Sequence, residues 1–151
     1  MGDLRSKLQA AIESIFPAVL GIELIETSTE RIVGRLLVRS ELCNLAHALH
    51  GGAFMTFADT LGGLGAFVNL PPGARTTTVE SKTNFLRAAS EGSVLVGESR
   101  PLHRGRTTMV WETRMSSEGG ALCAVVTQTQ LVIASGNNSR IGAGLRQVGA
   151  E

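Results

Sequence analysis

Residues 50–68 read HGGAFMTFADTLGGLGAFV, and their apolar side chains recur at i, i+3, i+4 and i+7. This spacing predicts an α-helix with an apolar surface too wide for a solvent-exposed helix, so we expect the helix to be buried. Asn69 and the segment Pro71-Pro72-Gly73 would end it. A buried helix needs a sheet or further helices to cover it.

Strand patterns lie on both sides of this helix. Before it, residues 21–38 predict a hairpin, and a short amphipathic helix that Pro17 ends would open the chain. After it, four strand-like runs occupy residues 76–86, 93–102, 106–116 and 121–134, and the third of them alternates cleanly between two faces. Consecutive hairpins predict an α+β fold, a mostly antiparallel sheet of six strands wrapped around one central helix. Such a sheet leaves an open edge and an open face, so we expect a partner subunit.

Length and composition limit the class of protein. The chain has 151 residues, which suits one domain over residues 1–134, followed by a Gly- and Ser-rich tail at 135–151 that we expect to be flexible. The 14 basic and 13 acidic residues give a net charge of +1, which argues against a nucleic-acid partner. No run is long and apolar enough to span a membrane, and the charged N-terminus is not typical of a signal peptide. We therefore expect a cytoplasmic protein in which Cys43 and Cys123 are reduced.

Gly51-Gly52 at the start of the predicted helix has two interpretations. The glycines could allow close packing of the helix end. Alternatively, their backbone N–H groups could form an anion or oxyanion site that a bulky acyl group can approach.

Asp59 is the one charged residue between Ala53 and Val68. A carboxylate in a buried helix costs several kcal/mol unless it is paired, so its presence needs a reason. A salt bridge is one reason, and a role as nucleophile or general base is another. Gly52 and Asp59 lie about 10 Å apart along the helix, at ~1.5 Å per residue. Two antiparallel copies of the helix would bring the glycines of one against Asp59 of the other, which predicts a site shared across a dimer.

His47 and His50 have i, i+3 spacing but no third ligand, so we expect no metal site here. His50 would instead shape the loop and hydrogen-bond backbone or substrate near Gly51. Asn44 offers an amide that could polarise a carbonyl.

The segment His50-Gly51-Gly52-Ala53, an apolar stretch and then Asp59 resembles the signature of hot-dog-fold acyl-CoA thioesterases. The similarity is to the phenylacetate-pathway type and to 4-hydroxybenzoyl-CoA thioesterases of the His-Gly-Gly kind. It covers roughly residues 22–132, including the order of elements.

The resemblance implies catalytic roles for several residues. The backbone N–H of Gly52 or Gly51 would polarise the thioester carbonyl, with Gly51 the better match because it directly follows the histidine, and Asn44 would support the same carbonyl or the water. Asp59 would attack the thioester carbon or activate water to do so. A polar residue found four positions after the acid in some family members is Gly63 here, and Thr78 on the following strand is the best match for a hydroxyl that replaces it.

The resemblance also implies contacts with the CoA nucleotide, at Arg87 and at the hairpin that contains Arg104, Arg106 and Thr107. Guanidinium groups bind phosphate bidentately, which suits this role. The alternative is a solvated hairpin tip.

Taken together, these residues predict an acyl-CoA thioesterase that needs no cofactor and forms homodimers, arranged as a dimer of dimers. Gly52, Phe54 and Met55 would line an apolar acyl pocket. The alternatives are a hot-dog hydratase or dehydratase and a non-catalytic acyl-CoA-binding module. The acyl preference, aryl or aliphatic, stays open.

Overall fold

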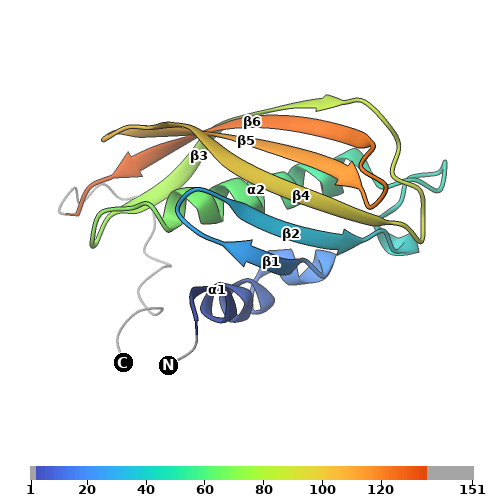
Figure 1. Ribbon diagram of the computed structural model, residues 1–151, viewed down its shortest axis with the longest axis horizontal. Coiled ribbons are helices and arrows are strands. Elements are labelled where there is room, and N and C mark those ends of the chain that lie inside the picture. Colours follow the sequence, from blue (N-terminus) through green and yellow to red (C-terminus); the bar gives the residue numbers. More distant parts are fainter. Residues whose placement is uncertain (1–2, 136–151) are drawn as a thin grey trace.

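The computed structural model describes residues 3–135 and shows an antiparallel sheet wrapped around one long helix (Figure 1). In chain order the elements are α1 (Leu4–Glu13), η1 (Phe16–Leu20), β1 (Glu23–Thr27), β2 (Ile32–Leu37), η2 (Ser40–Leu42), α2 (Gly51–Phe67), β3 (Arg75–Phe85), β4 (Val94–Arg104), β5 (Thr108–Ser117) and β6 (Leu122–Ile133). The predicted α+β fold is confirmed. Apart from Ser135, the tail predicted at 135–151 lies outside the described residues. Within residues 3–135, no helix is long and apolar enough to cross a membrane.

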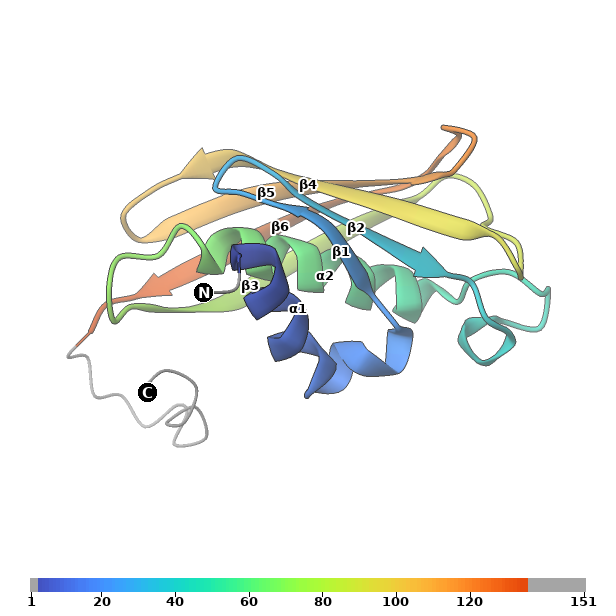
Figure 2. The ribbon, with the colours of Figure 1, turned by 60° about the horizontal axis from the view of Figure 1, so that its bottom comes forward.

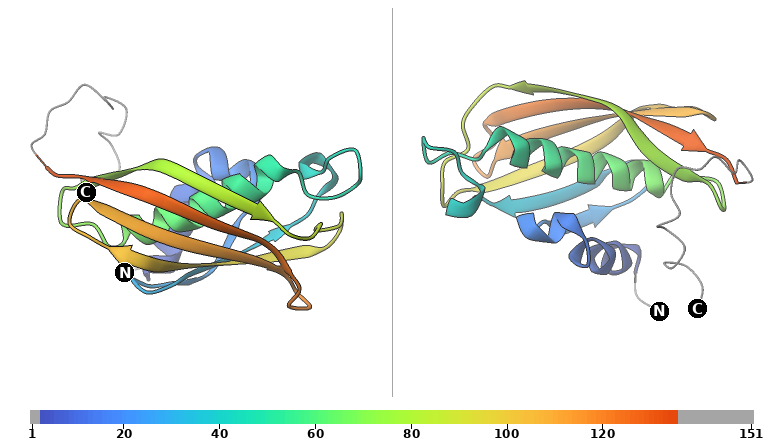
Figure 3. Two further views of the ribbon diagram at one scale, coloured as in Figure 1. Left: turned by 90° about the horizontal axis from the view of Figure 1, so that it is seen from above. Right: turned by 180° about the vertical axis from the view of Figure 1, so that it is seen from behind.

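The six strands follow the order β1-β2-β4-β5-β6-β3, and every neighbouring pair is antiparallel. The long helix α2 connects β2 to β3 and carries the chain from one part of the sheet to its far edge (Figures 2 and 3). As a consequence, β3 pairs with β6 on one side only, and most of its residues are exposed. The sheet therefore has an open edge at β3, and β1 forms its other edge.

Alternation along the strands sets which side chains face α2. In β5, the alternate residues Met109, Trp111, Thr113 and Met115 are all buried, as the sequence predicts. A Cβ atom at Gly65 would lie 2.6 Å from the Trp111 ring, so only glycine lets the helix approach the sheet this closely here. The core thus forms between one side of α2 and the inner face of the sheet.

The opposite side of α2 is not buried, which corrects the expectation of a fully buried helix. Met55 is 41% exposed and Phe67 is 57% exposed. Asp59 is exposed as well. The reason is that a single curved sheet covers one side of a helix, whereas α1 packs beside β1 at the sheet edge (Figure 2).

The 3-10 segments η1 and η2 were not predicted, and η1 follows α1 directly. The Gln9 side chain fixes α1 to the edge strand, because its Nε2 donates to the Ile22 carbonyl at 3.1 Å and its Oε1 accepts from the Leu24 amide at 2.8 Å. This docking places η1 beside α2, where Phe16 and Pro17 face the exposed side of the helix.

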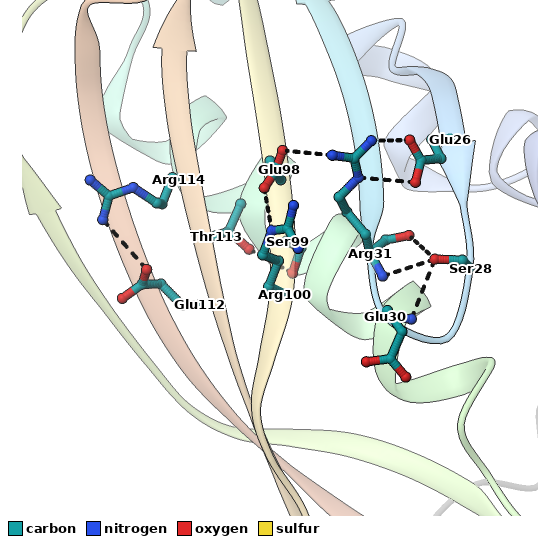
Figure 4. A network of polar contacts seen from close by, with 10 residues as sticks. All are labelled: Glu26, Ser28, Glu30, Arg31, Glu98, Ser99, Arg100, Glu112, Thr113 and Arg114. Carbon is teal, nitrogen blue, oxygen red and sulfur yellow. Dashed lines mark hydrogen bonds and ion pairs between the residues drawn. The ribbon is translucent and has the colours of Figure 1, made fainter.

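The outer face of the sheet carries ion pairs that cross from strand to strand (Figure 4). Arg31 pairs with Glu26 of β1 and lies 3.6 Å from Glu98 of β4. Arg31 hydrogen-bonds to Glu26 and thereby holds the pKa of that carboxyl below its usual range, while the pKa of Arg31 is raised in turn. Because these side chains are at least one-third exposed, each pair adds little to stability.

The Glu26–Arg31 pair predicts a pH-dependent contribution to stability. Since the pKa of Glu26 is lower in the folded chain than in the unfolded chain, this contribution is present above the usual carboxyl range and is lost as pH falls through the lowered pKa. Thermal melts of the wild-type chain and of Glu26→Gln should therefore differ near neutral pH and converge toward about pH 2. The exposed Glu118→Gln serves as the control, and a difference for Glu26→Gln that persists in acid would contradict the assignment.

Candidate functional site

His50 is the N-cap of α2, and its side chain shapes the first turn of the helix. Its Nδ1 accepts a hydrogen bond from the Gly52 amide at 2.9 Å, and its own amide donates to the Leu42 carbonyl at 2.8 Å. Because Nδ1 is an acceptor, the neutral ring carries its proton on Nε2. The Gly51 amide is left with no acceptor among residues 3–135. A free N–H at a helix N-terminus, where the helix dipole is positive, suits developing negative charge.

Asn44 lies in the loop before His50 and organises it. Its Oδ1 accepts from the Ala46 amide at 2.9 Å and from the Ala48 amide at 3.4 Å. The two N–H bonds of Nδ2 are then available to a ligand. His47 has a left-handed backbone, with φ at 53°, and its Nδ1 lies 2.9 Å from a Glu91 oxygen. No group of three or more metal-ligating side chains occurs in the described part of the chain.

A first hollow, of about 350 Å³, opens at the N-terminus of α2. Its lining brings together four residues that the sequence singled out, namely Asn44, Gly51, Phe54 and Arg87. Phe54 packs edge-to-face on Phe85 at the back of this hollow, with ring centroids 5.9 Å apart. The hollow thus combines an apolar wall with the Gly51 backbone N–H, the Asn44 side-chain amide and the Arg87 guanidinium.

Asp59 lies on the exposed side of α2, two turns further along, and is held there by hydrogen bonds. The Thr78 hydroxyl donates to its Oδ1 at 2.9 Å, and Gln128 Nε2 lies 3.4 Å from the same oxygen. The salt-bridge interpretation of Asp59 is wrong, because its partners within residues 3–135 are neutral. The structure therefore places Thr78 in direct contact with the acid.

Asp59 lines a second hollow, of about 390 Å³, and Gly51 is not among the residues that line it. It is lined by Phe16, Pro17, Met55, Thr56, Asp59, Thr60 and Ser81. Eight residues of helix separate Gly51 from Asp59, which amounts to about 12 Å along the axis. A single carbonyl group could not meet both in one chain. Gly63, one turn beyond Asp59, leaves open space where a side chain would stand.

The hairpin between β4 and β5 lies at the opposite end of α2 from Gly51 (Figure 1). Arg104 is engaged there in contacts that the sequence did not predict, because its Nη1 lies 2.6 Å from a Glu30 carboxylate oxygen and 3.2 Å from Asn69 Oδ1. Arg106 and Thr107 are exposed. Within one chain, the hairpin and the first hollow are thus separate features.

Cys43 borders the loop of the site beside His50. Desolvation by its surroundings, followed by the nearby Glu91 and Glu41, raises the pKa of the Cys43 thiol. Its Sγ also lies 3.3 Å from the Arg39 carbonyl as a donor. A protonated thiol is a poor nucleophile at neutral pH, so the carboxylate of Asp59 is the better candidate.

Several residues near the site were not predicted from the sequence, among them Phe16, Gln128 and Gln130. Phe16 reaches the Asp59 hollow from η1, which has no periodic pattern. Gln128 and Gln130 share the inner face of β6 with Val126, so the strand alternation could have identified them as inward-facing.

Comparisons with known proteins point to one family. The family model described as the thioesterase superfamily matches residues 46–124, just over half of the chain. A relative from Deinococcus radiodurans that carries an esterase name is 35% identical over 120 residues, covering 79% of this chain and 74% of that one. The proofreading thioesterase EntH of Klebsiella pneumoniae is 31% identical over 116 residues, covering 77% and 84%.

Solved structures agree with this assignment. A mutant of thioesterase PA1618 from Pseudomonas aeruginosa superposes with a TM-score of 0.82 and 25% identity, covering 88% of this chain and 96% of that one. A thioesterase protein of Streptococcus pneumoniae, solved with coenzyme A, superposes with a TM-score of 0.68 and 26% identity, covering 74% and 87%.

The Arg104 contacts predict a role in stability. An exposed ion pair contributes about 0.2–1 kcal/mol, which corresponds to at most ~4 °C in a domain of this size. Arg104→Ala should therefore lower the thermal midpoint by a few degrees, while Arg106→Ala, two residues away, should leave it unchanged. Equal midpoints for the two variants would show that the Glu30 contact contributes nothing.

Proposed function

We propose that this chain, which belongs to the thioesterase superfamily and is a thioester hydrolase, acts on acyl-CoA thioesters and builds each active site from two copies of itself. The supporting comparison is the thioesterase structure with bound coenzyme A. The observation that carries the proposal lies within α2. Its free Gly51 amide and its Asp59 carboxylate line different hollows. The first hollow holds the groups that polarise the thioester carbonyl, and the second holds the acid that attacks it or activates water.

The first half of the site polarises the thioester. The carbonyl oxygen accepts the Gly51 N–H, and the Asn44 Nδ2 donors and the dipole of α2 stabilise the negative charge that develops on it. His50 holds the turn through its contact with Gly52, which keeps the Gly51 N–H aimed at the substrate. Arg87, at the rim of the same hollow, is placed to meet a phosphate of CoA.

The second half supplies the attacking group. Asp59 of the other copy either removes a proton from water or attacks the carbonyl carbon itself and is then released by water. In both routes, water adds to the acyl carbon, the C–S bond breaks, and the products are a carboxylate and free CoA. Protein groups alone suffice for this reaction, so the proposal includes no cofactor.

The arrangement of the two copies follows from symmetry. If Gly51 of each chain faces Asp59 of the other across a two-fold axis, the axis passes near the midpoint, residue 55. Met55 occupies this position and is 41% exposed in the single chain, as expected for a flexible apolar residue that packs against its own copy. The free edge of β3 lies beside this face of α2 and offers backbone hydrogen bonds to the partner's edge.

The acid is tested by Asp59→Asn. Turnover of acyl-CoA should fall by at least ~10²-fold, the lower range for loss of general base catalysis, while the thermal midpoint changes little because the side chain is exposed. Glu80→Gln, which removes the same charge from the neighbouring strand, is the matched control and should keep full activity. Near-wild-type turnover in a folded Asp59→Asn protein would refute the assignment.

The shared site is tested by complementation. Gly51→Pro removes the amide N–H at a position where the helix tolerates proline, the first residue of α2. Mixing Gly51→Pro with Asp59→Ala should restore activity, because each mixed dimer contains one intact site. With random exchange, about a quarter of the wild-type activity is expected. If a tagged-subunit assay shows exchange and no activity returns, the two halves do not meet across a dimer.

A further inference from the structure

Two glutamine side chains of β6 are fully buried beneath Asp59. Gln128 is 0% exposed and Gln130 is 1% exposed, on the strand face whose other residues include Val126 and Ala124. Burying an amide costs several kcal/mol unless it is hydrogen-bonded, so these positions would be more cheaply filled by apolar side chains. Their Nε2 groups hydrogen-bond toward the carboxylate, Gln128 directly and Gln130 through Thr78, whereas the buried Gln128 Oε1 has no partner among residues 3–135.

The first path runs through Gln130 and Thr78 and has a defined direction. The Asp59 carboxylate can only accept, so the Thr78 hydroxyl at 2.9 Å must donate its single proton to Oδ1. The Thr78 oxygen is then an acceptor, and it receives Gln130 Nε2 at 2.7 Å. This orientation turns Gln130 Oε1 toward the Thr76 hydroxyl, which donates to it at 2.9 Å. Thr76 therefore orients Gln130, Gln130 orients Thr78, and Thr78 orients the Asp59 carboxylate.

The second path is direct and reaches the same oxygen. Gln128 Nε2 lies 3.4 Å from Asp59 Oδ1. By contrast, Oδ2 has no hydrogen-bond partner in residues 3–135. One carboxylate oxygen is thus contacted by two donors, and the other has no hydrogen-bond partner among these residues.

We propose that Gln128 and Gln130 are positioning residues that fix Oδ1 of Asp59 and thereby present Oδ2 as the reacting atom. This rests on the proposed function, in which Asp59 is the base or nucleophile. A carboxylate that rotates freely presents either oxygen in many directions, whereas one that is held loses little freedom on reaching the transition state.

The sequence of α2 provides the space for this arrangement. A Cβ atom at Gly62 would lie 2.5 Å from the Gln128 amide, so any other residue would push that amide away from Asp59. Alanine is otherwise favoured over glycine inside a helix by roughly 0.5–1 kcal/mol. Gly62→Ala should therefore lower turnover through Gln128, although overpacking of the core should lower the thermal midpoint as well.

The test compares variants that remove one donor at a time. Gln130→Met and Thr78→Val should each lower kcat for acyl-CoA by about 10-fold or more, with KM within about twofold, because positioning of the attacking atom is lost and substrate binding is not. Thr78→Ser, which keeps the hydroxyl, should restore most of the loss in Thr78→Val. The matched control is Thr83→Val on the same strand, since the buried Thr83 hydroxyl has no partner in the described residues and its loss should leave kcat unchanged.

The outcomes separate the positioning role of the glutamines from the catalytic role of Asp59. If a folded Gln130→Met keeps wild-type kcat while Asp59→Asn is inactive, the positioning role is wrong and the proposed function stands. If Gln130→Met does not fold, the comparison of Thr78→Val with Thr78→Ser tests the proposal instead. Equal kcat in these two variants would overturn the role of the hydrogen-bond path through Thr78. If Asp59→Asn is itself active, the proposed function is wrong, and the positioning role that rests on it is wrong as well. A fall in thermal midpoint with unchanged kcat across the series would show a structural role only.

Discussion

The packing of one side of α2 against the inner face of the sheet is the interaction on which both halves of the site depend. Phe57 and Leu61 are fully buried in this contact, and each contributes on the order of 1.5–3 kcal/mol by leaving water. Gly65 lets the helix sit directly on Trp111, which fixes how far the helix is from the sheet. Once the buried side is set, the rotation of α2 is set as well, and Asp59 must point outward.

Much of this fold could be predicted from local patterns. The strands were predicted from strand-like runs between glycine turns and, in the run that forms β5, from clean alternation between an inner and an outer face. The rotation of α2 was not predictable, because the helix is apolar on nearly all sides and its pattern does not distinguish the side toward its own sheet from the side toward a partner. The 3-10 segment η1 was missed because five residues are too few to show a period.

The site was predictable to the extent that it is contiguous in the sequence. Asn44, His50 and Gly51 lie within eight residues of one another, and the helix start that joins them follows from residue types alone. Gln128 reaches Asp59 directly and Gln130 reaches it through Thr78 only because β6 pairs with β3 and both lie under α2, a relation over about 70 residues of chain. Arg104 makes a contact that residue types alone do not reveal, since a glycine turn with arginines suggests phosphate but gives no sign of the Glu30 carboxylate that lies beside it.

The exposed apolar residues of α2 have a reason once the two halves are considered together. In the proposed shared site, an acid that serves a partner's substrate must remain uncovered by its own sheet, and so must the residues around it on the helix. Met55 and Phe67 therefore stay exposed in the single chain on the same side as Asp59. The docking of α1 beside β1 through Gln9, rather than across α2, is compatible with the proposed shared site. A helix placed over α2 would bury more apolar surface in one chain, but it would also separate Asp59 from the Gly51 amide of the other copy.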